Sequence, residues 1–241
     1  MALPKIDTPV YDLELPLSKK KIRFRPFLVK EQRNLMMAIE SDDKETIERN
    51  IRQVLHNCTL TEGLEIDRLP IIDVEFYFIN LRARSVGEVV QNRYRCENEV
   101  EEKPCGNLMD VELNILEIQP DMSGVVNDVI QVNDRISVKL KFPEFSILER
   151  ANKFESVTDM AFDMIAESVE YIFDGEQYYY AAESEPDEII EFIESLNQDQ
   201  FNKIENFFNN LPKLNKNIEV DCKKCGFHHS IQVEGLDSFF A

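Results

Sequence analysis

The N-terminal part of the chain alternates apolar and polar positions in steps of two. Residues 11–15 place a tyrosine and two leucines at every second position, residues 16–19 contain a proline and a serine, and the alternation resumes over 22–27. A period of two is typical of a strand with one buried and one solvent-exposed face. This segment therefore predicts a β-hairpin.

The spacing of apolar residues then changes to three and four, which is typical of amphipathic helices. We expect helices over 29–40 and 44–58, with Asp42 as the N-cap of the second. A third helix is predicted around Pro70, because proline suits the first turn of a helix, and its stretch 71–81 is apolar on almost every side. Short links between these helices predict a helical layer packed against the hairpin.

The middle of the chain returns to strand patterns. Residues 89–95 and 108–118 predict two strands, and residues 129–132 and 136–142 predict a second hairpin around an Asn-Asp turn. We expect these strands to form one antiparallel sheet together with the strands near the C-terminus.

The C-terminal part is again predicted to be mainly helical. Apolar residues recur at helical spacing over 156–173, and further helices are expected over 186–196 and 199–210, the last capped by Asn197. Between them, three consecutive tyrosines at 178–180 indicate a short strand. Their rings could stack on a ligand, but we expect them to pack under a helix.

Two pairs of cysteines carry the clearest chemical signal. Cys222 and Cys225 form a C-x-x-C-G sequence, in which Gly226 can adopt the positive φ that turns backbone N–H groups toward two thiolates. Cys96 and Cys105 form a looser pair, again between strand-like segments and again with a glycine after the second cysteine. Four cysteines on two hairpins are the ligand set of a structural zinc site.

The expected ligands of a structural Zn2+ ion are Cys96, Cys105, Cys222 and Cys225. Disulfides or unligated thiols are the alternatives, whereas a catalytic ion would need an open position that four thiolates do not leave. At most one of His228 and His229 could replace a cysteine, because neighbouring strand residues point to opposite faces, and we favour ordinary strand positions for both. Cys58, at the end of the second helix, is expected to be a small buried residue.

Together these patterns predict an α+β fold. An N-terminal β-hairpin and helical layer would be followed by central antiparallel strands with a zinc-ribbon-like four-cysteine corner, and then by C-terminal helices. At 241 residues the chain can bury a sizeable core without cross-links, so zinc would organise one corner only. We expect an N-terminal region over 1–87 and a strand-and-helix region over 88–241, with a single domain as the alternative.

Composition limits the class of partner. The chain has 46 acidic and 27 basic residues, which gives a formal net charge of -19. Such a chain repels a phosphate backbone, so we expect no nucleic-acid partner, and its acidic surfaces suit basic protein surfaces instead. No leader segment and no membrane-spanning apolar run is evident in the sequence. We expect a soluble cytosolic protein with no membrane partner, and a reducing cytosol favours metal over disulfides.

Motifs of catalysis and nucleotide binding are missing from the sequence. It has seven glycines, none in a phosphate-binding loop pattern, and three histidines, two of them close to the second cysteine pair. This leaves little material for a nucleophile and its base. We expect no enzymatic activity and no small-molecule substrate.

Segments near both ends of the chain carry a family resemblance. They are 3–11, 22–31 ahead of a Leu-Met-Met-Ala helix, 222–226 and 235–240. Together they resemble the baseplate hub protein family of T-even-like contractile-tailed bacteriophages. The resemblance covers most of the chain and includes no catalytic signature.

This resemblance implies a non-enzymatic part in tail morphogenesis, through contacts with other baseplate hub and tail proteins. The chain would be a hub component, or a chaperone that assists hub assembly, acting in the host cytoplasm or staying in the tail baseplate. Two alternatives stay open. A zinc-ribbon regulator that docks on polymerase or nucleic acid would need a basic face, and a metal-dependent hydrolase would need water in place of one thiolate.

Overall fold

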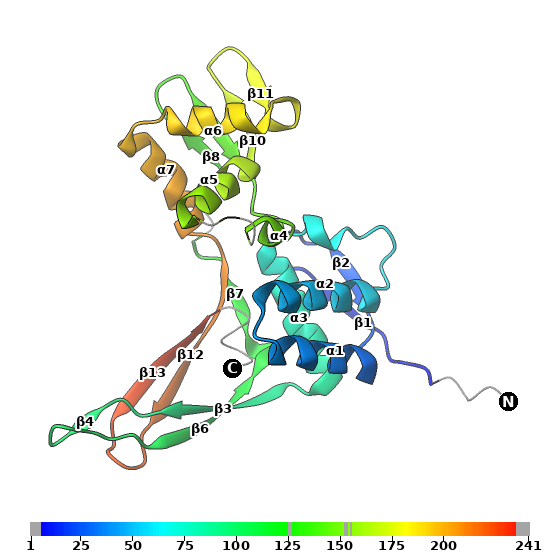
Figure 1. Cartoon of the computed structure of the whole chain (residues 1–241), viewed down its shortest axis with the longest axis vertical. Helices are drawn as coiled ribbons and strands as arrows, with labels where there is room; N and C mark the ends of the chain where they lie inside the picture. Colours follow the sequence, from blue (N-terminus) through cyan, green and yellow to red (C-terminus); the bar gives the residue numbers. More distant parts are fainter. Residues whose placement is uncertain (1–5, 125–126, 152–153, 155, 235–241) are drawn as a thin grey trace. The chain divides into compact units, whose positions relative to one another are not determined.

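The computed structural model describes residues 6–124, 127–151, 154 and 156–234. It divides into two compact units, both discontinuous in sequence (Figure 1). Unit 1 comprises Met1–Leu64, Ile72–Asp121 and Lys213–Ala241, and unit 2 comprises Glu65–Ile71 and Met122–Pro212. Every strand pair in the described part of the chain is antiparallel, and helices and strands are interspersed. The predicted α+β class is confirmed.

The described part of unit 1 contains three α-helices, a short 3-10 helix and the strands around the cysteines. Its elements are β1 (Tyr11–Glu14), β2 (Lys21–Phe24), α1 (Val29–Glu40), α2 (Lys44–Cys58), α3 (Ile71–Val86), β3 (Val89–Arg95), β4 (Glu99–Val100), β5 (Lys103–Pro104), β6 (Leu108–Asn114), η2 (Ile115–Glu117), β7 (Gln119–Asp121), β12 (Lys213–Asp221) and β13 (His228–Glu234). The N-terminal hairpin, the first two helices and β3 agree with the sequence patterns.

The start of α2 differs from the sequence prediction in its cap. The carboxylate of Asp43, not that of Asp42, accepts the backbone N–H of Thr46 at 3.1 Å. Asp42 instead adopts a positive φ of 54° in the tight link after α1. The helix therefore begins at Lys44 as expected, but its N-cap is Asp43, one residue after the predicted cap.

A buried carboxylate fixes the hairpin β1–β2 to α3. Asp73 is fully buried and accepts the backbone N–H groups of Leu17 and Ser18, each at 2.8 Å. One helical turn later, the buried Tyr77 has its hydroxyl 3.0 Å from the hydroxyl of Thr59. Polar groups that α3 carries into the interior are therefore satisfied by turns and loops of unit 1.

The core of unit 1 contains α3, strands β3 and β6, which precede the segment Met122–Pro212 of unit 2, and strands β12 and β13, which follow it. Its buried members are Ile72, Phe76, Ile79, Ala83, Val90, Val111, Leu113, Ile115, Ile118, Leu214, Ile218 and Val233. Because α3 shares this core with strands that follow it, the units do not follow the boundary expected near residue 88. The strand predicted over 108–118 also ends early, where the Asn114 side chain accepts the N–H of Leu116 and starts η2.

Unit 2 is a four-stranded sheet with helices on one face. Its elements are η1 (Ile66–Arg68), β8 (Val129–Gln131), β9 (Ser137–Leu140), α4 (Ile147–Ala151), α5 (Val157–Ser168), β10 (Val169–Phe173), β11 (Tyr178–Tyr180), η3 (Ala181–Glu183), α6 (Pro186–Glu194) and α7 (Gln198–Asn209). The strand order is β11-β10-β9-β8. The buried side chains between sheet and helices are Ile130, Val132, Val138, Leu140, Ile165, Val169, Ile172, Ile189, Ile193, Ile204 and Phe207.

Three expectations for this region are wrong. The helix predicted over 156–173 ends at Ser168, because 169–173 pairs with β9 on one side and β11 on the other. The hairpin β8–β9 belongs to this sheet and does not join the strands around the cysteines. The tyrosines at 178–180 are not covered by a helix and are between 42% and 53% exposed.

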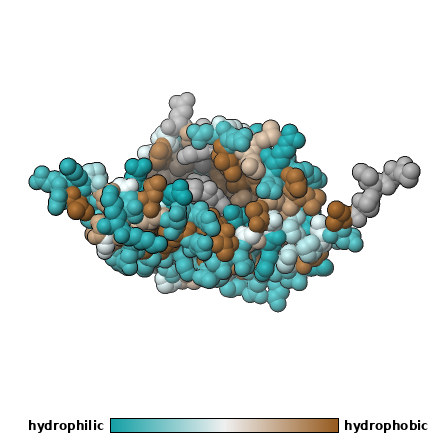
Figure 2. Space-filling view, turned by 90° about the horizontal axis from the view of Figure 1, so that it is seen from below, coloured by the Kyte–Doolittle hydropathy of each residue, from teal (hydrophilic) through white to brown (hydrophobic). Residues whose placement is uncertain are grey.

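The surface is mainly hydrophilic on the face that Figure 2 shows, where hydrophobic residues form small groups between hydrophilic ones. Scattered apolar residues of this kind are normal on a protein surface. Among the helices of the described residues, none is both long and apolar enough to cross a membrane.

The Asp73 contact generates a stability prediction. Replacing Asp73 by alanine removes the acceptor of two backbone N–H groups, so we expect the free energy of unfolding to fall by about 3 kcal/mol. Urea denaturation measures this loss, and amide hydrogen exchange should accelerate at Leu17 and Ser18. Asp110→Ala is the matched control, because its ion pair with Arg93 is exposed and such pairs contribute less than about 1 kcal/mol. Equal stability of the two variants would contradict the role assigned to Asp73.

Candidate metal centre

The first cysteine pair lies at the far end of the β3–β6 hairpin. These strands pair without a break from Val89 opposite Asn114 to Arg95 opposite Leu108. The backbone N–H of Cys96 then donates to the carbonyl of Asn107 at 2.8 Å. The chain continues into the small β4–β5 hairpin and returns to Cys105, so both cysteines of the pair lie at its base.

The second pair lies in the turn between β12 and β13. The Cys222 N–H donates to the carbonyl of Phe227 at 2.9 Å, and the Gly226 N–H donates to the carbonyl of Cys222 at 2.7 Å. Gly226 has a φ of 72°, and Gly106 has a φ of 62° at the equivalent place after Cys105. In both turns glycine supplies the left-handed conformation that other residues adopt only with strain.

The four sulfur atoms converge although they come from two hairpins. All four Sγ atoms lie within 4.8 Å of one another. The Sγ atoms of Cys96 and Cys225 are 3.6 Å apart, and those of Cys105 and Cys222 are 3.8 Å apart. Four thiolates bound tetrahedrally at about 2.3 Å from a zinc ion have sulfur–sulfur distances of about 3.8 Å. The described cysteines therefore fit a tetrahedral metal ion, and the predicted cluster forms.

The cluster is largely buried, and side-chain donors beside it favour thiolates. Cys96 and Cys222 are 1% exposed, while Cys225 is half-buried. The Asn98 side chain donates to Sγ of Cys225 at 3.7 Å, and the Asn107 side chain donates to Sγ of Cys222 at 3.5 Å. Donors to thiolate sulfur stabilise the ligands of a metal ion from outside the coordination shell.

The surroundings shift the pKa values of two of the thiols in opposite directions. The backbone N–H of Cys225, with help from that of Lys224, lowers the pKa of Cys222 to about 6. Burial raises the pKa of Cys96 to about 12. Because a metal ion needs every thiol deprotonated, binding at this cluster would release protons.

The two histidines after the turn point to opposite faces, as expected for neighbouring strand residues. Nε2 of His229 lies 3.2 Å from Sγ of Cys96, at the border of the sulfur cluster. His228 lies on the other side, with Nδ1 2.7 Å from Asp221 and Nε2 2.9 Å from Glu219. The hydrogen bond to Asp221 is the main reason that the pKa of His228 is raised.

The fifth cysteine is a core residue, as predicted. Cys58 is fully buried at the end of α2, and burial raises its pKa to about 11. Its Sγ accepts a hydrogen bond from the Arg25 side chain at 3.6 Å. Cys58 therefore serves as a buried comparison for the clustered thiols.

Sequence reasoning did not identify the two asparagines beside the cluster. Asn98 follows Cys96 by two residues, and Asn107 follows Cys105 by two residues. This repeated C-x-N spacing is the signal that could have revealed them. The repeat becomes apparent only when Cys96 and Cys105 are compared as ligands in equivalent turns.

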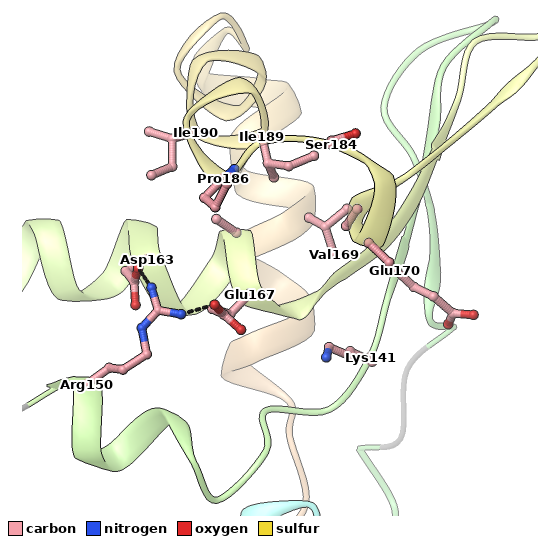
Figure 3. A pocket seen from close by; sticks show the side chains of 13 residues that line it. Lys141, Arg150, Asp163, Glu167, Val169, Glu170, Ser184, Pro186, Ile189 and Ile190 are labelled. Atoms are coloured by element: carbon pink, nitrogen blue, oxygen red, sulfur yellow. Dashed lines mark hydrogen bonds and ion pairs between the residues drawn. The ribbon is translucent and has the colours of Figure 1, made fainter. Parts of the chain in front are cut away.

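Unit 2 contains a separate pocket of about 300 Å³. Figure 3 shows Arg150 directed at Asp163 and Glu167, with Lys141 nearby and apolar side chains of α6 on the opposite wall. Arg150 forms ion pairs with both carboxylates, and the hydroxyl of Ser184 donates to the carbonyl of Tyr180. Arg150, Asp163 and Glu167 are thus engaged with one another, and we assign no chemistry to this pocket.

Fold and site define the class of this protein as an α+β protein with a closed four-cysteine centre between two hairpins. A family model described as T4 bacteriophage base plate protein matches residues 8–241, and the chain belongs to this family. Searches of curated proteins and of solved structures gave no match. The resemblance to T-even-like phage baseplate proteins is confirmed at this level, and membership implies a place in the virion tail and contacts with other phage structural proteins.

The sulfur cluster generates a prediction about metal content. Protein purified without chelator should contain about one tetrahedrally bound metal ion per chain, measured by native mass spectrometry. Cys225→Ser should remove most of this metal and destabilise unit 1 by several kcal/mol, within the roughly 10 kcal/mol typical of structural zinc binding. Cys58→Ala is the control, since it changes a buried thiol outside the cluster and should retain the metal. Metal retained in full by Cys225→Ser, with an unchanged melting temperature, would contradict the predicted ligand set.

His228 generates a prediction about pH. Its pKa is raised in the folded state, so any stabilisation from its contacts is fully present below the ordinary histidine value of about 6.5 and is lost as pH rises through the raised value. An NMR titration of the ring protons should place His228 above that ordinary value. Asp221→Asn should lower the pKa of His228 more than Glu219→Gln does, because Asp221 makes the larger contribution. The reverse order of the two variants would show that this cause is wrongly assigned.

Proposed function

We propose that this chain is a non-enzymatic part of the phage baseplate hub, acting either as a hub component or as a chaperone for hub assembly. The single observation that supports the proposal is the family match over residues 8–241. The chain would act by binding other hub and tail proteins in the host cytoplasm. Its resemblance to hub proteins supports the hub over other positions in the baseplate.

We further propose that the four-cysteine centre holds a structural zinc ion. Four thiolates close the tetrahedral shell and leave no position for water or substrate, which favours a structural role. Soft sulfur ligands in this geometry suit zinc among the common metal ions. The ion would join Cys96 to Cys225, which are 129 residues apart in sequence, and so stabilise the surface made by the two hairpins.

Charge favours protein partners for this surface. A net charge of -19 opposes binding to a nucleic-acid backbone, so a zinc-ribbon regulator that docks on nucleic acid is the less favoured function. The same charge would attract basic surfaces of other tail proteins and speed their association.

Co-expression with the other baseplate hub proteins of the same phage tests the proposal. Native mass spectrometry of the purified material should show a complex of defined stoichiometry that contains this chain and one zinc ion. Cys58→Ala is the matched control for Cys225→Ser, since Cys58 lies outside the cluster and its replacement should leave the complex intact. A lone monomer at every protein concentration tested would overturn the hub assignment, and turnover of an offered substrate would overturn the non-enzymatic one.

Purified virions distinguish the two forms of the proposal. Quantitative mass spectrometry should find a hub component in mature tails in a fixed ratio to other baseplate proteins. A chaperone would be abundant in assembly intermediates and absent from mature tails.

A further inference from the structure

The sheet face of unit 2 opposite the helices carries a cluster of aromatic rings. Tyr171 and Phe173 of β10 lie opposite Tyr180 and Tyr178 of β11 in the antiparallel register. The ring centroids of Phe173 and Tyr178 are 4.6 Å apart, and those of Tyr171 and Tyr178 are 5.1 Å apart. Tyr180 completes this aromatic face, with its centroid 6.0 Å from that of Tyr171.

The aromatic face is exposed although its rings contact one another. Tyr178 is 53% exposed and Tyr180 is 46% exposed. The neighbouring Ile172 points to the other side of the sheet, into the core beneath the helices. The aromatic rings are therefore not part of the core of unit 2. Large, rigid tyrosine side chains on a surface are typical of binding sites for other proteins.

The same rings lie next to an open sheet edge. β11 is the last strand in the order β11-β10-β9-β8. The backbone N–H of Asp174 donates to the carbonyl of Gln177 at the start of this hairpin. Asp174 and Gln177 are therefore a hydrogen-bonded pair, and Phe173 and Tyr178 form the next pair, which is not hydrogen-bonded because the two kinds of pair alternate along an antiparallel ladder. The backbone N–H and C=O of Tyr178 thus point away from β10, to the open edge. An extended segment from another chain could pair there as a further strand.

All charged residues in the sequence segment that carries this face are acidic. Residues 154–202 include fourteen aspartates and glutamates and not one lysine, arginine or histidine. Two cations from other segments lie near the face, and each has an acidic partner. Lys139, opposite Tyr171 in the sheet, binds Asp128 at 2.5 Å, and Arg135 lies 3.8 Å from Glu176. The segment that carries the aromatic face is therefore strongly negative as a whole, and its residues Asp174 and Glu176 lie in the turn that joins β10 to β11.

We propose that the aromatic face and the open edge of β11 bind an extended segment rich in arginine and lysine from another protein. The backbone of that segment would pair with β11. Its cationic side chains would lie over the tyrosine rings and near the acidic residues, two interactions that reinforce each other. The inference specifies one contact of the proposed assembly role, and it rests on that role for the origin of the partner.

A second copy of this chain is the less suitable occupant. Pairing β11 with its own equivalent would bring together two copies of the segment 154–202, which contains fourteen acidic residues and no lysine, arginine or histidine. Like charges that face each other across an interface oppose association. An extended cationic segment can pair with the edge of β11, lie over the tyrosine rings and complement the negative charge of the segment.

The test uses a fluorescently labelled peptide in which arginine and valine alternate. Its binding to the full-length protein is measured by fluorescence anisotropy at several salt concentrations. We expect saturable binding that weakens as salt rises. A peptide with glutamate in place of arginine should not bind, and a peptide N-methylated at alternate residues should bind more weakly because it cannot pair with β11. Equal binding of the three peptides, or no binding by any, would overturn the proposal.

Variants of the protein locate the site. Replacing both Tyr178 and Tyr180 by leucine keeps an apolar surface but removes the rings that attract cations, so we expect affinity for the arginine peptide to fall about tenfold. Tyr179→Leu is the matched control, because Tyr179 is similarly exposed but lies opposite Ile172 on the other face. Its affinity should change by less than about twofold. Circular dichroism and the melting temperature check that each variant is folded, and a folded double variant with unchanged affinity would overturn the site.

Co-expression with the hub proteins separates this inference from the proposed function. If hub proteins bind wild type and the folded double variant equally, the function stands and the aromatic face is not the contact. If the peptide binds as expected but no hub protein does, the surface stands and the hub assignment fails. Self-association that the double variant abolishes would identify a second copy as the occupant and overturn the cationic segment.

Discussion

The long-range closure of unit 1 is the constraint on which the rest of the structure depends. Strands β12 and β13 come after all of unit 2 in the sequence, yet Leu214, Ile218 and Val233 complete the core around α3. The sulfur cluster repeats this closure at the other end of the same strands. The larger part of unit 2, Met122–Pro212, is therefore an insertion in unit 1. A long insertion is tolerated because the entropy of closing a loop grows slowly with its length. Unit 1 can be complete only after unit 2 has been synthesised.

Local signals in the sequence were sufficient where the structure is decided locally. The ranges of α1, α2 and β3 could be predicted because each has an unbroken period. Asn197 caps α7 as expected, and it does so in a capping box with Gln200. The segment 156–173 could not be predicted, because its apolar positions also fit a helical period after Ser168. Only pairing with β9 and β11 makes 169–173 a strand, and partner strands are not visible in a local pattern.

The four clustered cysteines could be predicted from spacing, and the weakest part of that prediction has a structural explanation. Cys96 and Cys105 are farther apart in sequence than the usual pair of metal ligands. The interval is occupied by a hairpin of its own, in which Val100 pairs with Lys103 and the two turn residues between them adopt positive φ. A two-residue turn of this kind brings the chain back to its starting point, so the distance between the sulfurs does not depend on the length of the insertion. The donors Asn98 and Asn107 follow from the fold of the two turns and not from a recognised motif.

The uneven distribution of charge gives unit 2 a different character from unit 1. The segment 154–202 contributes most of the net negative charge, and it contains α5, β10, β11 and α6. Self-repulsion of this size opposes compact folding. A cationic partner would relieve the repulsion, and a partner that binds only the folded state stabilises it by mass action. Stability of unit 2 and binding at its surface are therefore linked, which suits a protein whose place is inside an assembly.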